Sequence, residues 1–206
     1  MKNEIITTVI FDIGNVLADF RWREYLDGFE YKEEVKDIIA KAVFQNQIWN
    51  ERDRGLKEEE EYLQQFCENA PMYEKEIREV FAGILEVVQA FDFSDDWVEA
   101  IKRQGKKVYF LSNYSKSNFE YSLEKFRFLQ NGDGGIISYQ VKQIKPEPYI
   151  YETLLKKYNI NPKEAVFLDD LKDNLETAKR FGIHTIHVTS HEAAVEGLKE
   201  YGIRSI

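Results

Sequence analysis

The stretch IITTVIFDIGNVLADF, residues 5–20, decides the fold. It opens with a short run of apolar and β-branched residues, which is typical of a strand buried on both faces of a parallel sheet. The run ends at Asp12, and the C-terminal ends of such strands are where open α/β sheets bind ligands. A second apolar run, residues 165–168, ends in the same way at Asp169 and Asp170. Two strand ends of this kind can supply oxygen ligands to one hard cation.

Composition limits the classes of protein to which the chain can belong. Its 206 residues, 43% of them hydrophobic, can bury a sizeable core as one large domain or as one domain with an inserted smaller one. The net charge of −9 argues against binding to nucleic acid or to a membrane surface, both of which favour basic patches. The N-terminus has no signal-peptide cleavage site, and the single cysteine, Cys67, cannot form an internal disulfide. We therefore expect a cytoplasmic protein, and the oligomeric state stays open.

Strands and helices alternate in the second half of the chain but not between the first strand and residue 91. That earlier block is charged and helical, with candidate helices at 32–44, 57–68 and 72–89. The later segments alternate between helix and strand in this order: 94–103, 107–111, 117–128, 136–139, 148–158, 166–168, 174–181 and 184–188. Repeated βα units predict an α/β fold with a Rossmann-like, mostly parallel sheet flanked by helices.

The helical block reads as a small α-helical cap inserted after the first strand. We place the Rossmann-like core at residues 1–19 and 92–206 and the cap at residues 20–91.

Carboxylates and an amide after the two strands are the first candidate site residues. Asp12 can attack phosphorus as a nucleophile and is ionised at neutral pH, although a strand-end aspartate also commonly caps a turn. Asp169 and Asp170 either hold a metal or cap a helix, whose N-terminus tolerates negative charge. Asp173 and Asn174 either support that site or lie in an exposed first helical turn.

A hydroxyl, an amide and an ammonium group complete the candidate set. Ser112 and Asn113 end the strand at 107–111, where they can donate hydrogen bonds to phosphoryl oxygens, but the pair is also an ordinary turn dipeptide. Lys145 precedes Pro146, which favours extended backbone, so its ammonium can be fixed near the strand ends and offset negative charge there. A solvent-exposed lysine is the commoner fate of a single Lys.

Taken in order, these segments resemble the four motifs of the haloacid dehalogenase-like (HAD) hydrolases. The matching segments are DIGNV at 12–16, SN at 112–113, IKP at 144–146 and DDLKDN at 169–174. The resemblance covers essentially the whole chain and implies a Mg²⁺-dependent phosphatase that hydrolyses a small phosphorylated metabolite through an aspartyl-phosphate. A sugar phosphate is one candidate substrate.

The resemblance also implies a role for each residue. Asp12 would be the nucleophile and a magnesium ligand, and Gly14 would offer its backbone carbonyl to the metal. Asp170 would be a direct ligand, with Asp169 acting through water. The phosphoryl group would be bound and stabilised by Ser112, Asn113 and Lys145.

One position departs from the family pattern. Phosphatases of this family usually carry a second aspartate two residues after the nucleophile, where this chain has Gly14. That acid protonates the leaving oxygen, and such proton transfer contributes roughly 10²–10⁴-fold to rate. Three interpretations follow. In the first, the leaving group of the substrate needs little help from an acid, as in an anomeric sugar phosphate. In the second, another residue such as Asp19 supplies the proton. In the third, the chain is a catalytically weak phospho-ligand-binding or regulatory protein.

Hydrolysis is our preferred reading because the D-x-G-x-V subset of the family, with members resembling bacterial α-glucose-1-phosphate phosphatase, looks similar here. Dehalogenation leaves the pair Asp169 and Asp170 unexplained, and phosphomutases usually need the missing acid.

Substrate choice is expected to lie in the cap, whose first part is rich in aromatic and arginine side chains. These residues are Phe20, Arg21, Trp22, Arg23, Trp49, Arg52 and Arg54. The aromatics can stack on a sugar and an arginine can bind a second anion, but we favour core packing for the tryptophans and surface ion pairs for the arginines. The three histidines are expected to be structural.

Overall fold

Five short strands form one parallel sheet in the computed structural model, which describes residues 5–204. The strands are β1 (Thr8–Phe11), β4 (Lys107–Ser112), β5 (Gly135–Ile137), β6 (Ala165–Asp169) and β7 (His184–His187). Their order is β5-β4-β1-β6-β7, and every neighbouring pair is parallel. The predicted α/β fold is therefore confirmed. Because β1 lies between β4 and β6, Asp12 follows the central strand at the edge where Ser112 and Asp169 end theirs.

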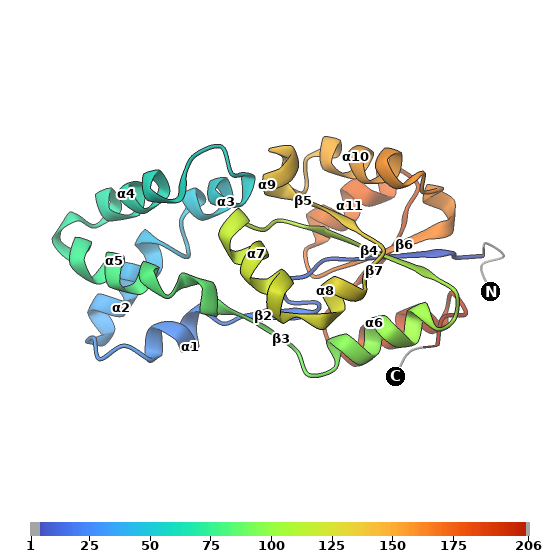
Figure 1. Ribbon diagram of the computed structural model, residues 1–206, viewed down its shortest axis with the longest axis horizontal. Helices are drawn as coiled ribbons and strands as arrows, with labels where there is room; N and C mark the ends of the chain where they lie inside the picture. The colour runs from blue at the N-terminus through green and yellow to red at the C-terminus, as the bar shows by residue number, and fades with distance from the viewer. Residues whose placement is uncertain (1–4, 205–206) are drawn as a thin grey trace.

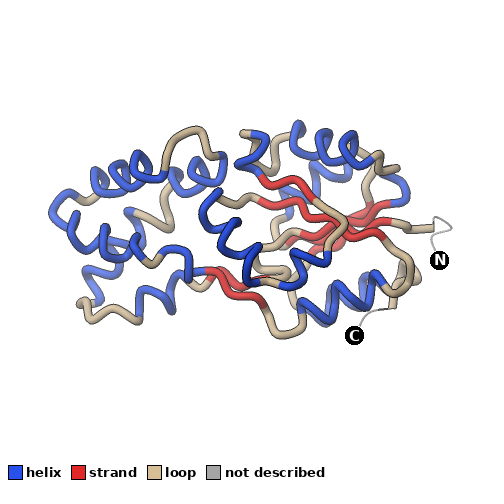
Figure 2. Tube along the Cα trace, viewed as in Figure 1, coloured by secondary structure: helices blue, strands red, loops and turns tan. Residues whose placement is uncertain are grey.

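Helices cover both faces of the sheet, as Figures 1 and 2 show. On one face pack α6 (Ser94–Lys102), α7 (Lys116–Lys125), α8 (Arg127–Asn131) and α12 (His191–Lys199). On the other pack α10 (Pro148–Tyr158) and α11 (Lys172–Arg180). The alternation of side chains along β1 divides the core: Ile10 joins the cluster under α10 and α11, whereas Val9 and Phe11 join the other.

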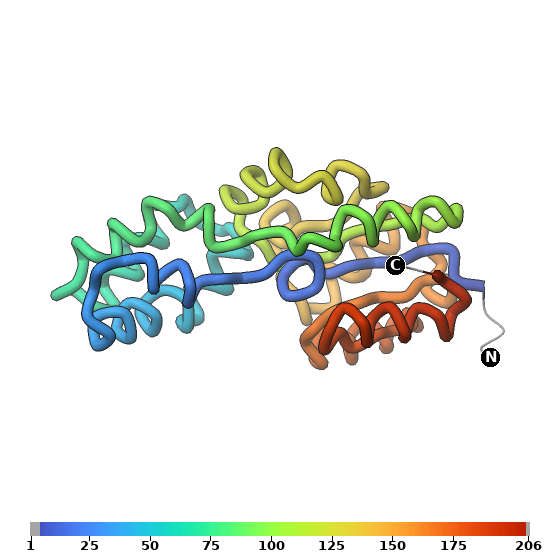
Figure 3. The backbone as a smooth tube through the Cα atoms, turned by 90° about the horizontal axis from the view of Figure 1, so that it is seen from below, coloured from blue at the N-terminus to red at the C-terminus, as the bar shows by residue number. Residues whose placement is uncertain are grey.

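Five further helices gather beyond one end of the sheet, at the left of Figure 1. They are α1 (Trp22–Asp27), α2 (Glu33–Ala42), α3 (Gln47–Arg54), α4 (Glu59–Asn69) and α5 (Glu74–Ala82). The chain reaches them through β2 (Ala18–Phe20) and returns through β3 (Val88–Ala90), which pair antiparallel and run side by side in Figure 3. The division into a core and a cap at residues 20 and 91 stays a prediction.

The structure corrects the predicted helix at 72–89. Residues 71–73 form a short 3₁₀ helix, α5 follows and ends at Ala82, and a second 3₁₀ helix spans Ile84–Val87 before β3. Gly83 ends the α-helix, and β-branched Val88 suits the extended strand that pairs with β2. The apolar spacing is real, because Ile77, Val80 and Ile84 are all buried, but two successive elements share it.

Other element boundaries differ less. The predicted helix at 117–128 divides into α7 and α8 at Phe126. Five helices were not predicted: α1, α3, α12, the short α9 (Ser138–Val141) and the 3₁₀ helix Pro162–Glu164. Ser94 begins α6 without capping it, since its hydroxyl donates to the Leu17 carbonyl at 2.6 Å. Cys67 is buried in α4. None of the described helices is long and apolar enough to cross a membrane.

Removing the Ile10 side chain should destabilise the protein strongly. Ile10 is fully buried in the central strand, and Ile→Ala changes at such sites cost about 2–5 kcal/mol because a cavity is left behind. Ile5, in the same N-terminal stretch, is 76% exposed, so Ile5→Ala is the matched control and should change little. Urea unfolding of both variants measures the difference; equal stability would contradict the central placement of β1.

Candidate active site

The predicted residues meet at the C-terminal edge of the sheet around one buried ion pair. The Lys145 ammonium lies 2.8 Å from a carboxylate oxygen of Asp12 and 2.7 Å from one of Asp169. The three side chains are 1%, 10% and 0% exposed. Lys145 is therefore not the surface lysine of the alternative reading: its buried side chain joins the ends of β1 and β6.

Asp12 is held by two further donors. The Ser112 hydroxyl and the Ile13 backbone N–H both donate to its other carboxylate oxygen, each at 2.7 Å. These contacts come from the end of β4 and from the turn that follows β1. The carboxylate is thus fixed in one orientation before any substrate arrives.

Asn113 positions the lysine. Its side-chain amide donates to the Lys145 carbonyl at 3.0 Å and its side-chain oxygen accepts from the Lys145 N–H at 2.7 Å. The Lys145–Pro146 peptide bond that follows is cis. Because both ends of the amide are engaged with the Lys145 backbone, the Asn113 side chain acts in this structure through the lysine.

Asp169 is saturated with donors. Its carboxylate accepts from the Leu171 N–H at 2.8 Å and from Lys145 at 2.7 Å, and the side-chain amide nitrogen of Asn174 donates to both of its oxygens at 3.0 Å. Asn174 is itself buried, and its carbonyl accepts from the Tyr151 hydroxyl at 3.0 Å. The structure thus joins Asn174 to the site through Asp169.

Asp170 is more open than Asp169. It is partly buried and accepts one side-chain hydrogen bond, at 3.0 Å, from the amide of Asn15. Asn15 was not among the predicted site residues. The backbone of Asn15 is left-handed, with φ of 56°, a conformation that asparagine tolerates better than most residues. An asparagine directly after Gly14 in the first segment was therefore the sequence signal for a special backbone position here.

Two predicted residues contribute no side chain to this network. Gly14 lines the cavity described below, and a Cβ added there would meet no atom within 4 Å, so this position is open space. Asp173 is exposed in the first turn of α11 and lines a neighbouring pocket with Lys145 and Asp170.

Negative charge is in excess at the site. Oxygen atoms of Asp12, Asp169 and Asp170 all lie within 4.8 Å of one another, against the single ammonium of Lys145. Burial raises the pKa of Asp12, with the ammonium of Lys145 opposing this, and burial likewise raises the pKa of Asp170. Burial alone would lower the pKa of Lys145, but the two neighbouring carboxylates raise it above its ordinary value. Such a set of oxygen donors fits a hard divalent cation, whose charge would balance the surplus.

A cavity of about 300 Å³ opens directly above these groups. Its floor is the core, with Asp12, Ser112 and Lys145, and its opposite wall belongs to the cap side of the chain. That wall contains the following residues: Phe20, Phe44, Trp49, Asn50, Arg52, Asp53 and Val88. Polar groups that can bind a phosphate thus share the cavity with a wall that combines apolar side chains with Asn50, Arg52 and Asp53.

The arginines of the cap differ in their environments. Arg54 pairs with Glu51 and Glu147, and Arg21 lies beside Asp19, in partial agreement with the expected surface ion pairs. For Arg52 that expectation is wrong. Its side chain is 1% exposed, because it bonds Glu59 at 2.7 Å and Asn118 at 2.7 Å. The tryptophans Trp22 and Trp49 pack against the main core cluster, as expected.

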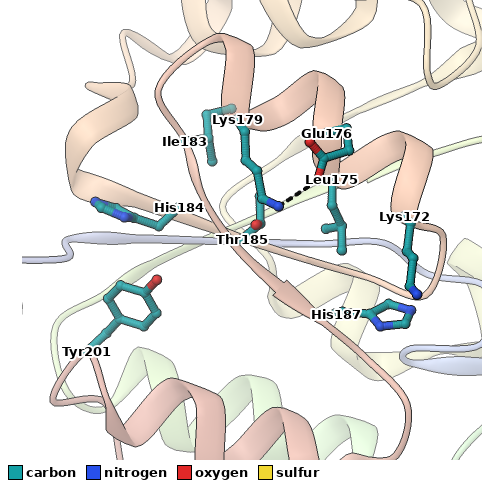
Figure 4. Close-up of a pocket in the computed structure, with 9 residues that line it drawn as sticks. All are labelled: Lys172, Leu175, Glu176, Lys179, Ile183, His184, Thr185, His187 and Tyr201. Atoms are coloured by element: carbon teal, nitrogen blue, oxygen red, sulfur yellow. Dashed lines mark hydrogen bonds and ion pairs between the residues drawn. The ribbon is translucent and has the colours of Figure 1, made fainter.

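A second cavity, of about 530 Å³, lies between α11 and β7 and is drawn in Figure 4. Its lining includes Lys172, Lys179 and His187, and the Lys179 ammonium pairs with Glu176 at 2.6 Å. None of the predicted site residues lines it. The first cavity is therefore the candidate active site.

The fold and site together define a Rossmann-like α/β protein with a cation-compatible acidic cluster at the carboxyl edge of its sheet. A family model described as haloacid dehalogenase-like hydrolase matches residues 6–182. The chain belongs to this family, as its four segments indicated. The narrower D-x-G-x-V subset stays a prediction.

Curated relatives include one long protein and two of similar length. The chain is 29% identical over 203 residues to mouse acyl-CoA dehydrogenase family member 10, covering 93% of this chain but 18% of that protein. It is 25% identical to a sesquiterpene phosphatase of Aspergillus oryzae, covering 93% of this chain and 94% of the relative. It is 24% identical to a D-ribitol-5-phosphate phosphatase of Bacteroides thetaiotaomicron, covering 88% and 91%.

Among solved structures, a HAD family enzyme from Bacteroides thetaiotaomicron in complex with magnesium and inorganic phosphate superposes with a TM-score of 0.68. The identity is 24%, and the alignment covers 90% of this chain and 96% of that enzyme. This likeness confirms the fold.

Replacing Lys145 should cost more stability than replacing an exposed lysine. Lys145→Met leaves two buried carboxylates without their shared ammonium, and removal of one partner from a buried ion pair costs about 3–5 kcal/mol. Lys116→Met is the matched control, because that side chain is 68% exposed. Urea unfolding in the presence of a metal chelator measures both. A loss no larger than that of the control would show that Lys145 does not hold the strand ends together.

Proposed function

We propose that the protein is a Mg²⁺-dependent phosphatase that hydrolyses a small phosphorylated metabolite through an aspartyl-phosphate on Asp12. The observation that carries this proposal is the fixed carboxylate of Asp12 at the floor of a cavity, flanked by a buried ammonium and an acidic cluster. The phosphatases among the relatives and the magnesium- and phosphate-bound structural neighbour support it.

Asp12 and Asp170 are the residues we assign to hold the metal through their side chains, together with the Gly14 carbonyl. Asp169 is a poorer direct ligand, since three donors already engage its oxygens, and it is assigned a supporting role through water. When bound, Mg²⁺ would shield the attacking carboxylate from the negative charge of the phosphate.

The core residues would bind the transferred group. Ser112 and Lys145 face the cavity beside Asp12, so a hydroxyl and an ammonium would stabilise charge on the phosphoryl oxygens. Asn113 would act by holding the lysine, and its role as a phosphate ligand stays a prediction. Attack by Asp12 forms the P–O bond of the aspartyl-phosphate as the bond to the leaving oxygen breaks, and water later releases phosphate.

The substrate's leaving part would contact the cap. A cavity of about 300 Å³ suits a small metabolite, and Phe20, Phe44 and Trp49 offer rings for apolar or stacking contact. A sugar phosphate is compatible with this wall, and so is a more apolar phosphate ester. In this proposal residues 20–91 act as a substrate-selecting cap, and the two-stranded β2–β3 link is its connection to the core.

The competing function is a catalytically weak phospho-ligand-binding protein. The observation that favours it is the open space at Gly14, where the family's phosphatases usually place an acid. Haloacid dehalogenation would use the same aspartate but leave the acidic cluster at Asp169 and Asp170 without a purpose.

Asp12→Asn should abolish phosphate release while the fold is retained, because an amide cannot serve as the nucleophile. The measurement is Mg²⁺-dependent release of phosphate from aryl, anomeric sugar and primary-alcohol phosphates, with thermal melting as the check on folding. Activity that persists in Asp12→Asn would remove the aspartyl-phosphate mechanism. A wild-type protein that binds phosphate but releases none from any of these esters would favour the binding function.

Asp170→Ala should raise the Mg²⁺ concentration needed for half-maximal activity far more than Lys172→Ala. Asp170 lines the cavity, whereas Lys172 is exposed at the start of α11 and does not line it. Titration of activity with Mg²⁺ compares the two variants. If both require the same concentration, Asp170 is not a metal ligand.

A further inference from the structure

Phosphate-ester hydrolysis at this site needs a proton donor for the leaving oxygen. Among the described residues, three with carboxyl groups line the cavity: Asp12, Asp53 and Asp170. Asp12 is already assigned to attack and Asp170 to the metal. Asp53 is the carboxyl group that the proposed mechanism does not yet use.

The substitute considered from the sequence, Asp19, is poorly placed. It lies in β2 with its side chain 42% exposed, pointing toward Arg21 at 3.8 Å, and it is not among the described residues that line the cavity.

Asp53 is on the cap, but the core fixes its position. The Ser138 hydroxyl donates to the Asp53 carbonyl at 2.5 Å. The side chains on either side of it are also bonded to core residues: Arg52 donates to Asn118 at 2.7 Å and Arg54 donates to Glu147 at 2.8 Å. Three consecutive residues of α3 are thus attached to the core, so Asp53 has a defined place in the wall opposite Asp12.

The surroundings of Asp53 favour its protonated form. Burial raises its pKa to about 7, and the charges of Glu59 and Asp12 raise it as well. The Arg52 guanidinium and the Ser115 N–H act in the opposite direction. A carboxylic acid with this pKa can both donate and accept a proton near neutral pH, which is what general acid–base catalysis requires.

We propose that Asp53 is the catalytic acid and base of this site, supplying from the cap the proton transfer that Gly14 cannot. The proposal rests on the phosphatase function proposed above. In the first step, a carboxylate oxygen of Asp12 bonds to phosphorus, the bond from phosphorus to the leaving oxygen breaks, and that oxygen takes the proton of Asp53. In the second, the Asp53 carboxylate takes a proton from water as the water oxygen bonds to phosphorus and the bond to Asp12 breaks. The products are an alcohol and phosphate, with Asp53 protonated again.

Asp53→Asn tests the proposal, because asparagine keeps the shape but cannot transfer a proton. Phenyl phosphate releases a phenol with a pKa of about 10, like that of tyrosine, and needs protonation; 4-nitrophenyl phosphate releases a far better leaving group. We expect Asp53→Asn to lower turnover of phenyl phosphate by about 10²–10⁴-fold and that of 4-nitrophenyl phosphate by a much smaller factor. Asp37→Asn removes an exposed carboxylate from another cap helix, α2, outside the cavity lining, and should leave both rates unchanged.

Two further measurements separate acid catalysis from a structural role. Gly14 has open space, so Gly14→Asp added to Asp53→Asn should restore much of the lost phenyl phosphate turnover. In the wild type, that turnover should fall as the pH rises through about 7, because the donor loses its proton there, and Asp53→Asn should lack this alkaline decline.

The outcomes also distinguish the two proposals. If Asp12→Asn is inactive but Asp53→Asn lowers both substrates equally or neither, the phosphatase stands and Asp53 is not its acid. If Asp12→Asn remains active, or the wild type hydrolyses neither ester, the proposed function fails and the role of Asp53 fails with it.

Discussion

One ammonium shared between two buried carboxylates organises the functional edge of the sheet. Each of these charges would cost several kcal/mol to bury alone, so the position of Lys145 is acceptable only with Asp12 and Asp169 around it. Asn113 forms hydrogen bonds with the Lys145 backbone, and Asn174 donates a hydrogen bond to Asp169. The ion pair therefore connects all four of the segments that carry the predicted site residues. Because one ammonium does not neutralise the nearby carboxylates, the arrangement that joins the strands also leaves negative charge that a divalent cation would balance.

A second polar contact joins the cap to the core. Arg52 is buried between α4 and α7 by Glu59, Ser117 and Asn118, and Trp49 lies beside its guanidinium, 5.1 Å from ring centroid to carbon. Hydrogen bonds of this kind specify one orientation more narrowly than apolar contact does. The cavity wall is therefore set by the helix α3 and its ties, and the shape offered to a ligand depends on cap residues that a sequence reading places on the surface.

The strands and most of the site were predictable because their causes are local. Apolar runs that end in Asp12 and Asp169 reveal two parallel strands, and parallel strands bring their ends to one edge, so convergence follows from topology. The remainder depends on distant partners. Residues 88–90 are extended because they pair with residues 18–20, which no local pattern shows. The run NERDR, at 50–54, reads as an exposed charged helix, but its arginines are buried or anchored in part by Asn118 and Glu147, which lie far along the chain.

The cavity is lined by the core on one side and by the cap on the other, which makes an acid on the cap chemically reasonable. A phosphoryl group bound by Ser112 and Lys145 and attacked by Asp12 presents its leaving oxygen on the side opposite the nucleophile, since attacking and leaving oxygens stand in line. Asp53 lines the same cavity from the cap, so in the proposed mechanism we expect the leaving oxygen to lie toward it. A donor on α3 would approach the leaving oxygen from the cap, where the leaving part of the substrate is proposed to lie. The nucleophile and its acid then belong to separate parts of the chain, so the contacts that hold α3 against the core would bear directly on the rate.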